Sequence, residues 1–205
     1  MNEILKNIIE KVGLETFVIS FIVTLGIVLI YLRVFKNFKQ AKLQKDQRKK
    51  EIKSVVETTS MTCFFILCYV IVITGLGSFT FSNIYINILA LIVYIIGTVF
   101  NLLGRKYLGA NWGNNVVIYT NHTLVTDGVY KVVRHPLYAS IIWMIYAVGI
   151  LYKNYLVIIL NTIIFIPFMT YRAKQEEKEL EKIFEEYKNY KKRVGMFFPK
   201  ILKRR

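Results

Sequence analysis

The sequence predicts an all-α fold: a polytopic membrane protein with about five transmembrane helices and a cytoplasmic C-terminal helix. The first observation is composition. Of the 205 residues, 55% are hydrophobic, and the mean hydropathy of +0.42 exceeds that of an ordinary soluble domain. The second is segment length, because a transmembrane helix needs about 20 mostly apolar residues in a row. Several such runs occur, so membrane spans explain the composition better than an unusually apolar soluble core.

Basic residues predict the orientation. The net charge of +15 is concentrated in two blocks, residues 36–53 and 172–205, and each block adjoins an apolar segment. Lysine and arginine beside transmembrane helices favour the cytoplasmic side and attract anionic lipid headgroups. We therefore expect the N-terminus outside and the C-terminus in the cytoplasm, and we do not expect nucleic-acid binding.

Residues 1–106 are predicted to form a three-helix membrane scaffold. Residues 1–13 carry apolar positions at helical spacing, either as a helix on the membrane surface or as the start of the first span. The expected spans, separated by a basic connector and an uncharged turn, are residues 14–35, 55–77 and 84–103. Cys63 and Cys68 lie in the second span without neighbouring metal ligands, so we interpret them as small apolar side chains and predict no metal site.

Residues 107–205 are predicted to carry the functional site and to form one integrated domain with the scaffold. A loop ends at Pro136, where a proline suits the first turn of a helix. Two short apolar helices, 137–151 and 155–169, should then cross the membrane as a hairpin. Pro167 is expected to kink the second of them.

The C-terminal part of this region is predicted to be an amphipathic cytoplasmic helix. The pattern changes from apolar to highly charged at Tyr171, and Pro199 terminates the element. Apolar residues recur there at spacings of three and four, which is typical of one buried helix face. These residues are Leu180, Ile183, Phe184, Tyr187 and Tyr190.

The candidate site lies in residues 122–138, which hold both histidines of the chain. The spans themselves carry almost no charge, whereas transport pathways usually leave ionisable residues at mid-membrane depth. A site at the cytoplasmic surface is therefore favoured. His135 precedes a proline, so its backbone should be extended and its ring should lie at the start of a helix. Arg134 adds a fixed positive charge beside it.

Arg172 and Glu176 form a second candidate pair. They are four residues apart, hence on one helix face, at the point where the last span leaves the bilayer. Such a pair could bind a ligand that carries both charges. It could equally form an intrahelical salt bridge worth a few tenths of a kcal/mol. The spacing leaves both interpretations open.

Two motifs in these regions carry a family resemblance. The run LVTDGVYKVVRHPLY at 124–138, preceded by His122, resembles the signature of the isoprenylcysteine carboxyl methyltransferase family. The run RAKQEE at 172–177, followed by FEEYKNYKKRV and Pro199, resembles the C-terminal motif of the same family. The two motifs occur in the expected order, separated by the expected helical hairpin.

The resemblance implies an integral-membrane enzyme that uses S-adenosyl-L-methionine without a Rossmann fold. The sequence indeed contains no G-x-G-x-x-G turn. The resemblance assigns Glu176 to the cofactor's ammonium and Arg172 to the substrate's carboxylate, and Arg134 would help to balance the charge of the site. The other positions implied to contact the cofactor are His122, Leu124, Val125, Tyr130, His135, Pro136, Leu137 and Tyr138.

Three positions depart from the family pattern. Val129 stands where many relatives have proline, and Glu185 replaces a glycine that follows the phenylalanine. Ile118 lies where relatives can use a polar cofactor contact. None of these departures removes a charged group from the candidate site.

The chemistry implied is methyl transfer to a lipid-like or prenylated acceptor. A sulfonium methyl is already activated, so displacement requires alignment, and a carboxylate acceptor, ionised at neutral pH, requires no general base. An amine acceptor would require one, and a histidine would then be the natural base. Carboxyl O-methylation of an isoprenylcysteine-like acceptor and lipid N-methylation are therefore both open. A sterol-type reductase using NADPH and a non-enzymatic transport or assembly protein are the alternatives from other classes.

Overall fold

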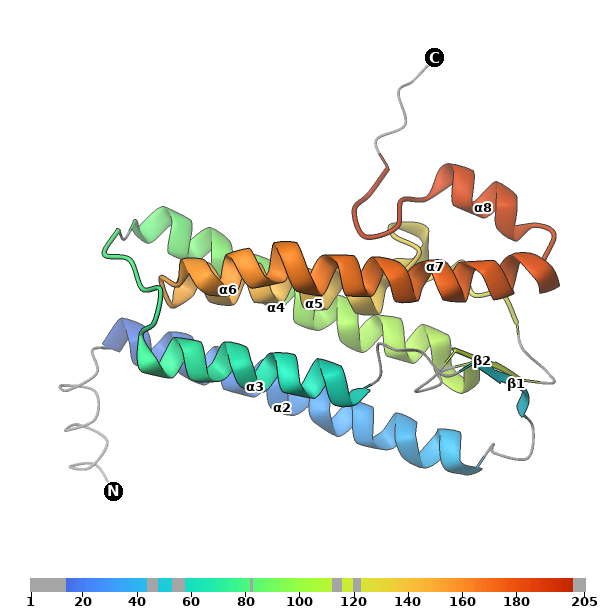
Figure 1. Cartoon of the computed structure of the whole chain (residues 1–205), viewed down its shortest axis with the longest axis horizontal. Coiled ribbons are helices and arrows are strands. Elements are labelled where there is room, and N and C mark those ends of the chain that lie inside the picture. The colour runs from blue at the N-terminus through green and yellow to red at the C-terminus, as the bar shows by residue number, and fades with distance from the viewer. Residues whose placement is uncertain are drawn as a thin grey trace, which may run out of the picture.

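The computed structural model describes residues 14–43, 48–52, 58–81, 83–111, 116–119 and 123–200, and these residues are almost entirely helical (Figure 1). The predicted all-α class is confirmed. The predicted segment 1–13 and the candidate residue His122 lie outside the described residues. The helices are α2 (Leu14–Leu43), α3 (Thr58–Thr74), α4 (Ile84–Leu108), α5 (Pro136–Leu151), α6 (Tyr155–Leu160), α7 (Ile166–Ile183) and α8 (Tyr187–Arg193).

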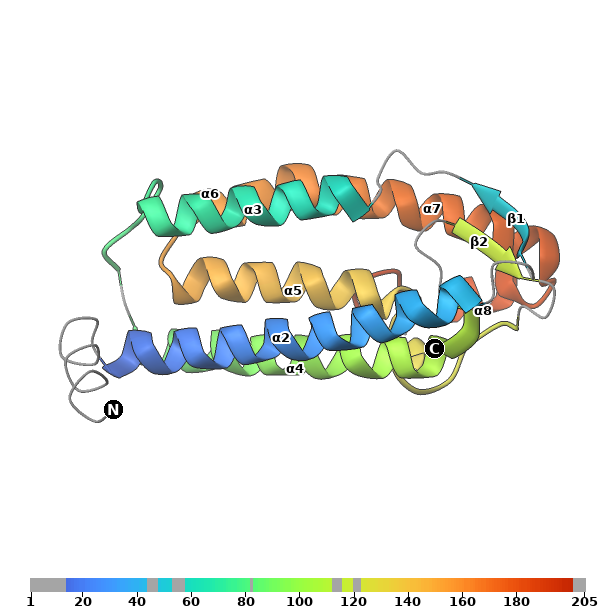
Figure 2. The same cartoon turned by 90° about the horizontal axis from the view of Figure 1, so that it is seen from below.

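Helix α5 is the centre of the bundle. In Figure 2, α2 and α4 lie side by side on one side of α5, and α3 lies with α6 and α7 on the other. Two apolar clusters meet on α5: one includes Ile142 and Met169 and joins α3 and α7, and the other includes Ala147 and Tyr94 and joins α2 and α4. Because α5 is buried on several sides, its sequence is apolar almost throughout.

The chain is a multi-pass membrane protein. Among the described residues, three helices are long and apolar enough to cross a bilayer: α2 over Leu14–Gln40, α4, and the continuous helix Tyr155–Ile183. The helices α3 and α5 are apolar but shorter, so the five predicted spans comprise three of full length and two shorter ones. Large hydrophobic side chains on α2, α3 and α4 remain exposed, as expected for surfaces that face lipid.

The prediction that the last membrane helix ends at Met169 is wrong. The helix continues without interruption to Ile183. The change from apolar to charged residues alters what surrounds the helix, but alanine, lysine, glutamine and glutamate all favour helical backbone. A π-helical turn at Asn161–Phe165 ends two residues before Pro167, and α7 continues from it. Such wide turns relieve the hydrogen-bond mismatch that a proline introduces.

The single C-terminal amphipathic helix is also corrected. The helix ends where Phe184 adopts an extended backbone (φ −118°, ψ 106°), and α8 begins three residues later. Tyr187 and Tyr190 are therefore buried on α8 rather than along α7. In Figure 1, α8 lies against the charged end of α7. This reversal brings the last described residues back toward the start of α5.

A short antiparallel ladder was not predicted. The strand β1 (Arg48–Ile52) pairs with β2 (Val116–Tyr119), which follows α4 (Figure 1). Each strand is short and finds its partner far away in the sequence, so neither shows a local hairpin pattern. The ladder ties two connectors together at the end of the bundle that holds the candidate site.

Close contact between α4 and α5 depends on Gly97. A side chain at this position would place its Cβ 2.6 Å from the Cγ of Met144 and 3.1 Å from the carbonyl oxygen of Ser140. Small residues at such crossings allow membrane helices to approach closely.

We expect Gly97→Val to lower the free energy of unfolding by about 1–3 kcal/mol, because the added atoms force α4 away from α5. The melting temperature of the protein in detergent would measure this effect. Ile96→Val is the matched control, since Ile96 is exposed on the same helix. Equal melting temperatures for Gly97→Val and the control would contradict the packing described.

Candidate functional site

A tight turn sets up the first half of the site. Gly128 has φ +59°, and a Cβ there would collide with the ring of Tyr107, so the position requires glycine. The following 3₁₀ turn, Gly128–Lys131, buries Tyr130. The hydroxyl of Tyr130 donates to the carbonyl of Gly104 (3.4 Å), and the carbonyl of Tyr130 accepts from Tyr190 (2.6 Å). Burial raises the pKa of both tyrosines, so their hydroxyls remain hydrogen-bond donors.

His135 caps α5 and is held by the C-terminal segment. Its backbone (φ −122°, ψ 67°) avoids the helical region, as the following Pro136 requires. The backbone N–H groups of Arg134 and His135 donate to the carbonyls of Gly195 (2.8 Å) and Met196 (3.2 Å). Residues beyond α8 therefore fix the start of α5.

A buried carboxylate, Glu177, lies behind the histidine. Only 1% of its side chain is exposed. Its Oε1 atom accepts from Arg134 Nε (2.9 Å) and lies 3.1 Å from His135 Nε2, and its Oε2 atom lies 2.9 Å from Lys191 Nζ. We call these four residues the Glu177 cluster. Arg134 also donates to the carbonyls of Lys191 (3.1 Å) and Val194, so the cluster joins α5, α7 and α8.

Glu176 faces a different way. Consecutive helical residues diverge by about 100°, so Glu176 and Glu177 cannot share a face. Glu176 is 25% exposed; it accepts a hydrogen bond from the hydroxyl of Tyr138 and lies 3.5 Å from both His135 Nδ1 and Arg172 Nε. The guanidinium of Arg172 lies 5.8 Å from the ring centre of Tyr138. Arg172 and Glu176 thus form an intrahelical salt bridge, and both also line the candidate site. The salt bridge and a pair that faces a ligand, the two interpretations left open by the spacing, are therefore compatible.

His135 is placed between two carboxylates. Burial acts most strongly and lowers its pKa, but hydrogen bonds and charge attraction from Glu176 and Glu177 outweigh burial, so the pKa is raised above 6.5. Both ring nitrogens face a carboxylate, which suits an imidazolium that donates from both.

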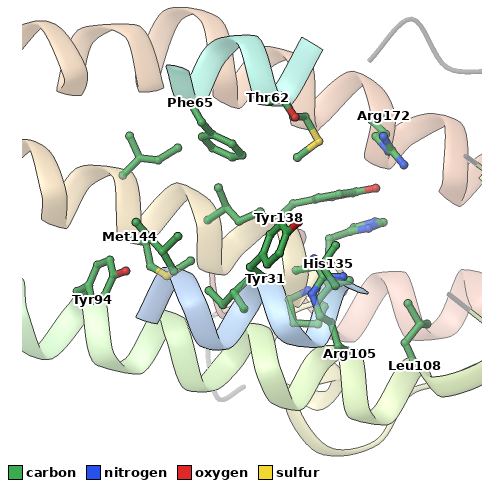
Figure 3. A pocket seen from close by; sticks show the side chains of 18 of the residues that line it. Tyr31, Thr62, Phe65, Tyr94, Arg105, Leu108, His135, Tyr138, Met144 and Arg172 are labelled. Carbon is green, nitrogen blue, oxygen red and sulfur yellow. The ribbon is translucent and has the colours of Figure 1, made fainter. Parts of the chain in front are cut away.

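These residues lie at one end of a cavity of about 940 Å³. Figure 3 shows His135, Tyr138, Arg172 and Arg105 together at this end, and Phe65, Met144 and Tyr94 farther along the cavity. The volume is within the range of sites that hold small molecules. Every predicted site residue that the structure describes lines this cavity: Leu124, Val125, Tyr130, Arg134, His135, Pro136, Leu137, Tyr138, Arg172 and Glu176.

Two parts of this arrangement were not predicted from the sequence. Glu177 and Lys191 belong to a highly charged segment, and charged residues are usually exposed. The only signal in the sequence was the pair of adjacent glutamates, since two neighbouring helix positions cannot both face the same surroundings. Arg105 was not among the predicted site residues, but it is buried and lines the cavity. Its Nε donates to Asn101 Oδ1 (2.9 Å), and Asn101 donates to Ser140 Oγ (2.9 Å). An asparagine within an apolar span was the signal available for this network.

Comparisons with known proteins find similar sequences and a similar fold. The model of the isoprenylcysteine carboxyl methyltransferase family matches residues 88–182, which include most of α4, all of α5 and most of α7. The predicted family resemblance is confirmed. The protein-S-isoprenylcysteine O-methyltransferase of Xenopus laevis is 32% identical over 123 residues, which cover 57% of this chain and 42% of that protein. The methanethiol S-methyltransferase of Pseudomonas deceptionensis is 39% identical over 77 residues, 37% of this chain and 28% of that protein.

The fold has a solved counterpart. The eukaryotic intramembrane Ras methyltransferase ICMT superposes with a TM-score of 0.56 at 24% identity, covering 70% of this chain and 53% of that one. The chain therefore shares the membrane fold of this enzyme. It spans less than half the length of the two curated relatives named above.

We expect Glu177→Ala to lower the free energy of unfolding by about 3–5 kcal/mol, because three cationic side chains lose a buried partner. Thermal unfolding in detergent would measure the loss. Glu181→Ala is the matched control: Glu181 lies on the same helix and contacts the same Lys191 (2.9 Å), but it is partly exposed. Glu181→Ala should lower the free energy of unfolding by less than about 1 kcal/mol. Similar losses in both variants would contradict a special role for the buried carboxylate.

The raised pKa of His135 predicts a pH dependence of stability. A raised folded-state pKa contributes stability that is complete below the unfolded value of 6.5 and is lost as the pH rises through the folded value. The melting temperature of the ligand-free protein should therefore fall as the pH is raised above about 6.5. His135→Gln should flatten this slope, whereas His122→Gln should retain it. A slope unchanged in His135→Gln would refute the assignment.

Proposed function

We propose that this protein is an S-adenosyl-L-methionine-dependent methyltransferase that methylates the carboxylate of an isoprenylcysteine-like acceptor at the membrane–cytoplasm interface. One observation carries the proposal: Glu176, Arg172 and His135 meet at the polar end of a mostly apolar cavity between membrane helices. The family match over residues 88–182 and the names of the relatives support the same activity.

The residues present fit the methyl donor. Glu176 is the more exposed member of the acidic pair and lines the cavity, so its carboxylate is available to the donor's ammonium group. The ring of His135 stacks on Tyr138 with 5.6 Å between ring centres and an interplanar angle of 11°. These rings and the apolar Leu124 and Val125 provide surfaces for a nucleoside. When bound, S-adenosyl-L-methionine would supply an activated methyl group on a sulfonium.

Arg172 would orient the acceptor. A guanidinium can hold a carboxylate through two parallel hydrogen bonds, which aligns the attacking oxygen without a general base. Arg172 lies beside Glu176, so this oxygen would be held next to the methyl donor. Arg134 contacts Glu177 and the end of α8, so we assign it a positioning role, in which it holds His135 in place.

The contacts of the two ring nitrogens of His135 favour an oxygen acceptor over an amine acceptor. An amine must lose a proton before or during attack, and a histidine base would need a free ring nitrogen. Both nitrogens of His135 face carboxylates, which raises the pKa of the ring and leaves neither nitrogen directed at an acceptor. A carboxylate acceptor needs no such base.

The apolar part of the cavity favours a lipid-like acceptor over a small thiol such as methanethiol. Side chains from α2, α3 and α5 line it, including Ile27, Phe65 and Ile141. The helix α2 packs on α4 and α3 packs on α6, whereas α2 and α3 have little mutual contact. A lipid could therefore reach the cavity from the bilayer. The orientation predicted from the basic blocks, with the site and C-terminus in the cytoplasm, belongs to this proposal.

The decisive assay is transfer of a labelled methyl group from S-adenosyl-L-methionine to an S-farnesylcysteine analogue and, separately, to total membrane lipids. Label in a base-labile methyl ester of the analogue is the expected result. Label only in lipid amines would replace O-methylation with N-methylation. Binding of NADPH without binding of S-adenosylhomocysteine would favour the reductase alternative, and binding of neither would favour a non-enzymatic protein.

Two variants should separate binding of the donor from positioning of the acceptor. Glu176→Gln should weaken S-adenosylhomocysteine binding about 10-fold or more, because a charge-assisted contact is lost. Arg172→Lys should change this binding little and lower kcat/KM for the acceptor about 10- to 100-fold, because the planar fork is lost. Isothermal titration and the methyl-transfer assay give the two quantities, with Glu181→Gln as control. Loss of donor binding in Arg172→Lys with normal acceptor turnover would reverse the two assignments.

A further inference from the structure

The cavity extends along almost the whole of α5. Its lining includes Tyr138 in the first turn of α5 and Tyr152, the residue that caps its end. A helix rises about 1.5 Å per residue, so the path from Tyr138 to Tyr152 is roughly 21 Å long. Between them the cavity is lined by α5 residues at helical spacing: Ile141, Met144, Ile145 and Val148. The cavity is therefore a long, mostly apolar slot with its charged groups at the Tyr138 end.

Tyrosines bound to α2 lie at the far end of the slot. The hydroxyl of Tyr152 donates to Ser20 Oγ (3.1 Å), which bridges the end of α5 to α2. The hydroxyl of Tyr94, on α4, donates to the carbonyl of Val23 (2.7 Å), also on α2. Tyr94 is 3% exposed, and a Cβ at Gly26 would come within 2.8 Å of its ring, so it is tightly packed. Two hydrogen-bonded rings thus limit the slot at this end.

We propose that Tyr152, held by Ser20, is the stop that sets the length of the acceptor's apolar chain. The inference rests on the proposed function, because the chain must carry its reacting carboxylate at Arg172. It also places the occupant: an extended isoprenoid lies along α5 with its tip against Tyr152. The continuity of the slot with the charged end, where Arg172 lies against Tyr138, fixes this direction.

The length of the slot selects one acceptor size. An extended chain advances about 1.25 Å per bond, given a 1.52 Å carbon–carbon bond and a near-tetrahedral angle. A path of roughly 21 Å therefore holds about 17 bonds, which is a main chain of about 17–18 atoms. A cysteine bearing a C15 prenyl group has about 16 such atoms from its carboxyl carbon to the chain tip, whereas a C20 group adds about four more. The longer chain would have to displace Tyr152 from Ser20 and lose that hydrogen bond.

The test is a chain-length series of S-prenylcysteines with C10, C15 and C20 groups, assayed by methyl transfer with the full chain in lipid nanodiscs. The wild type should have its highest kcat/KM with C15. Tyr152→Ala should raise the ratio of kcat/KM for C20 over C15 about 10-fold, because removal of the ring lengthens the slot. Tyr152→Phe should keep most of the wild-type preference, because the ring remains.

A second variant with the opposite expected effect keeps the proposal testable if Tyr152→Ala does not fold. Val148 lies one turn before Tyr152 on the same face of α5, so Val148→Phe should shorten the slot by about 6 Å and shift the preference toward C10. Tyr155→Ala is the matched control, because Tyr155 is 48% exposed, lies three residues from Tyr152 and is not part of the cavity lining. S-adenosylhomocysteine binding should be the same in all variants.

The outcomes separate this inference from the proposed function. Methylation of all chain lengths with equal kcat/KM, or unchanged ratios in both Tyr152→Ala and Val148→Phe, would overturn the length stop and leave the methyltransferase proposal intact. A wild-type protein that binds S-adenosylhomocysteine but methylates no prenylcysteine would overturn both. Opposite shifts in the two variants, with Tyr155→Ala unchanged, would establish the stop.

Discussion

The buried carboxylate of Glu177 is the interaction on which the site depends. It brings Arg134 and His135, at the start of α5, into contact with Lys191 on α8. An almost fully buried carboxylate is costly unless it is paired, and here it has three cationic partners, two at the start of α5 and one on α8. The same contacts place the ring of His135 so that its other nitrogen faces Glu176. The contacts of Glu177, which lies outside the cavity lining, therefore determine how the ring of His135 is oriented in the cavity.

The cavity combines two environments that a methyltransferase for membrane acceptors would need close together. Its charged end has Arg172, Glu176 and His135, and the remainder is a slot between helices that themselves face lipid. Helix α5 links the two, since it begins at the histidine and ends at the tyrosine that we propose as the length stop. One rigid helix would thus fix the distance between the reacting group and the tip of the chain.

Much of the architecture could be predicted because it follows from local pattern. The apolar runs predicted the helices, and Pro136 predicted the start of α5. The predicted helix end at Met169 was wrong, since composition reports the surroundings of a helix rather than its continuity. The break at Phe184 was missed because the charged and apolar pattern runs through it without a glycine or proline.

The sequence by itself determined that this is a helical membrane protein with a polar site near His135, Arg172 and Glu176, because hydrophobic length, charge and motif are local properties. The tertiary structure alone decided that the adjacent Glu177 is buried behind His135. It also decided that Arg134 binds Glu177 and that Tyr152 meets Ser20 across the bundle. Those outcomes depend on the rotation of each helix against its neighbours, and packing between distant segments sets that rotation.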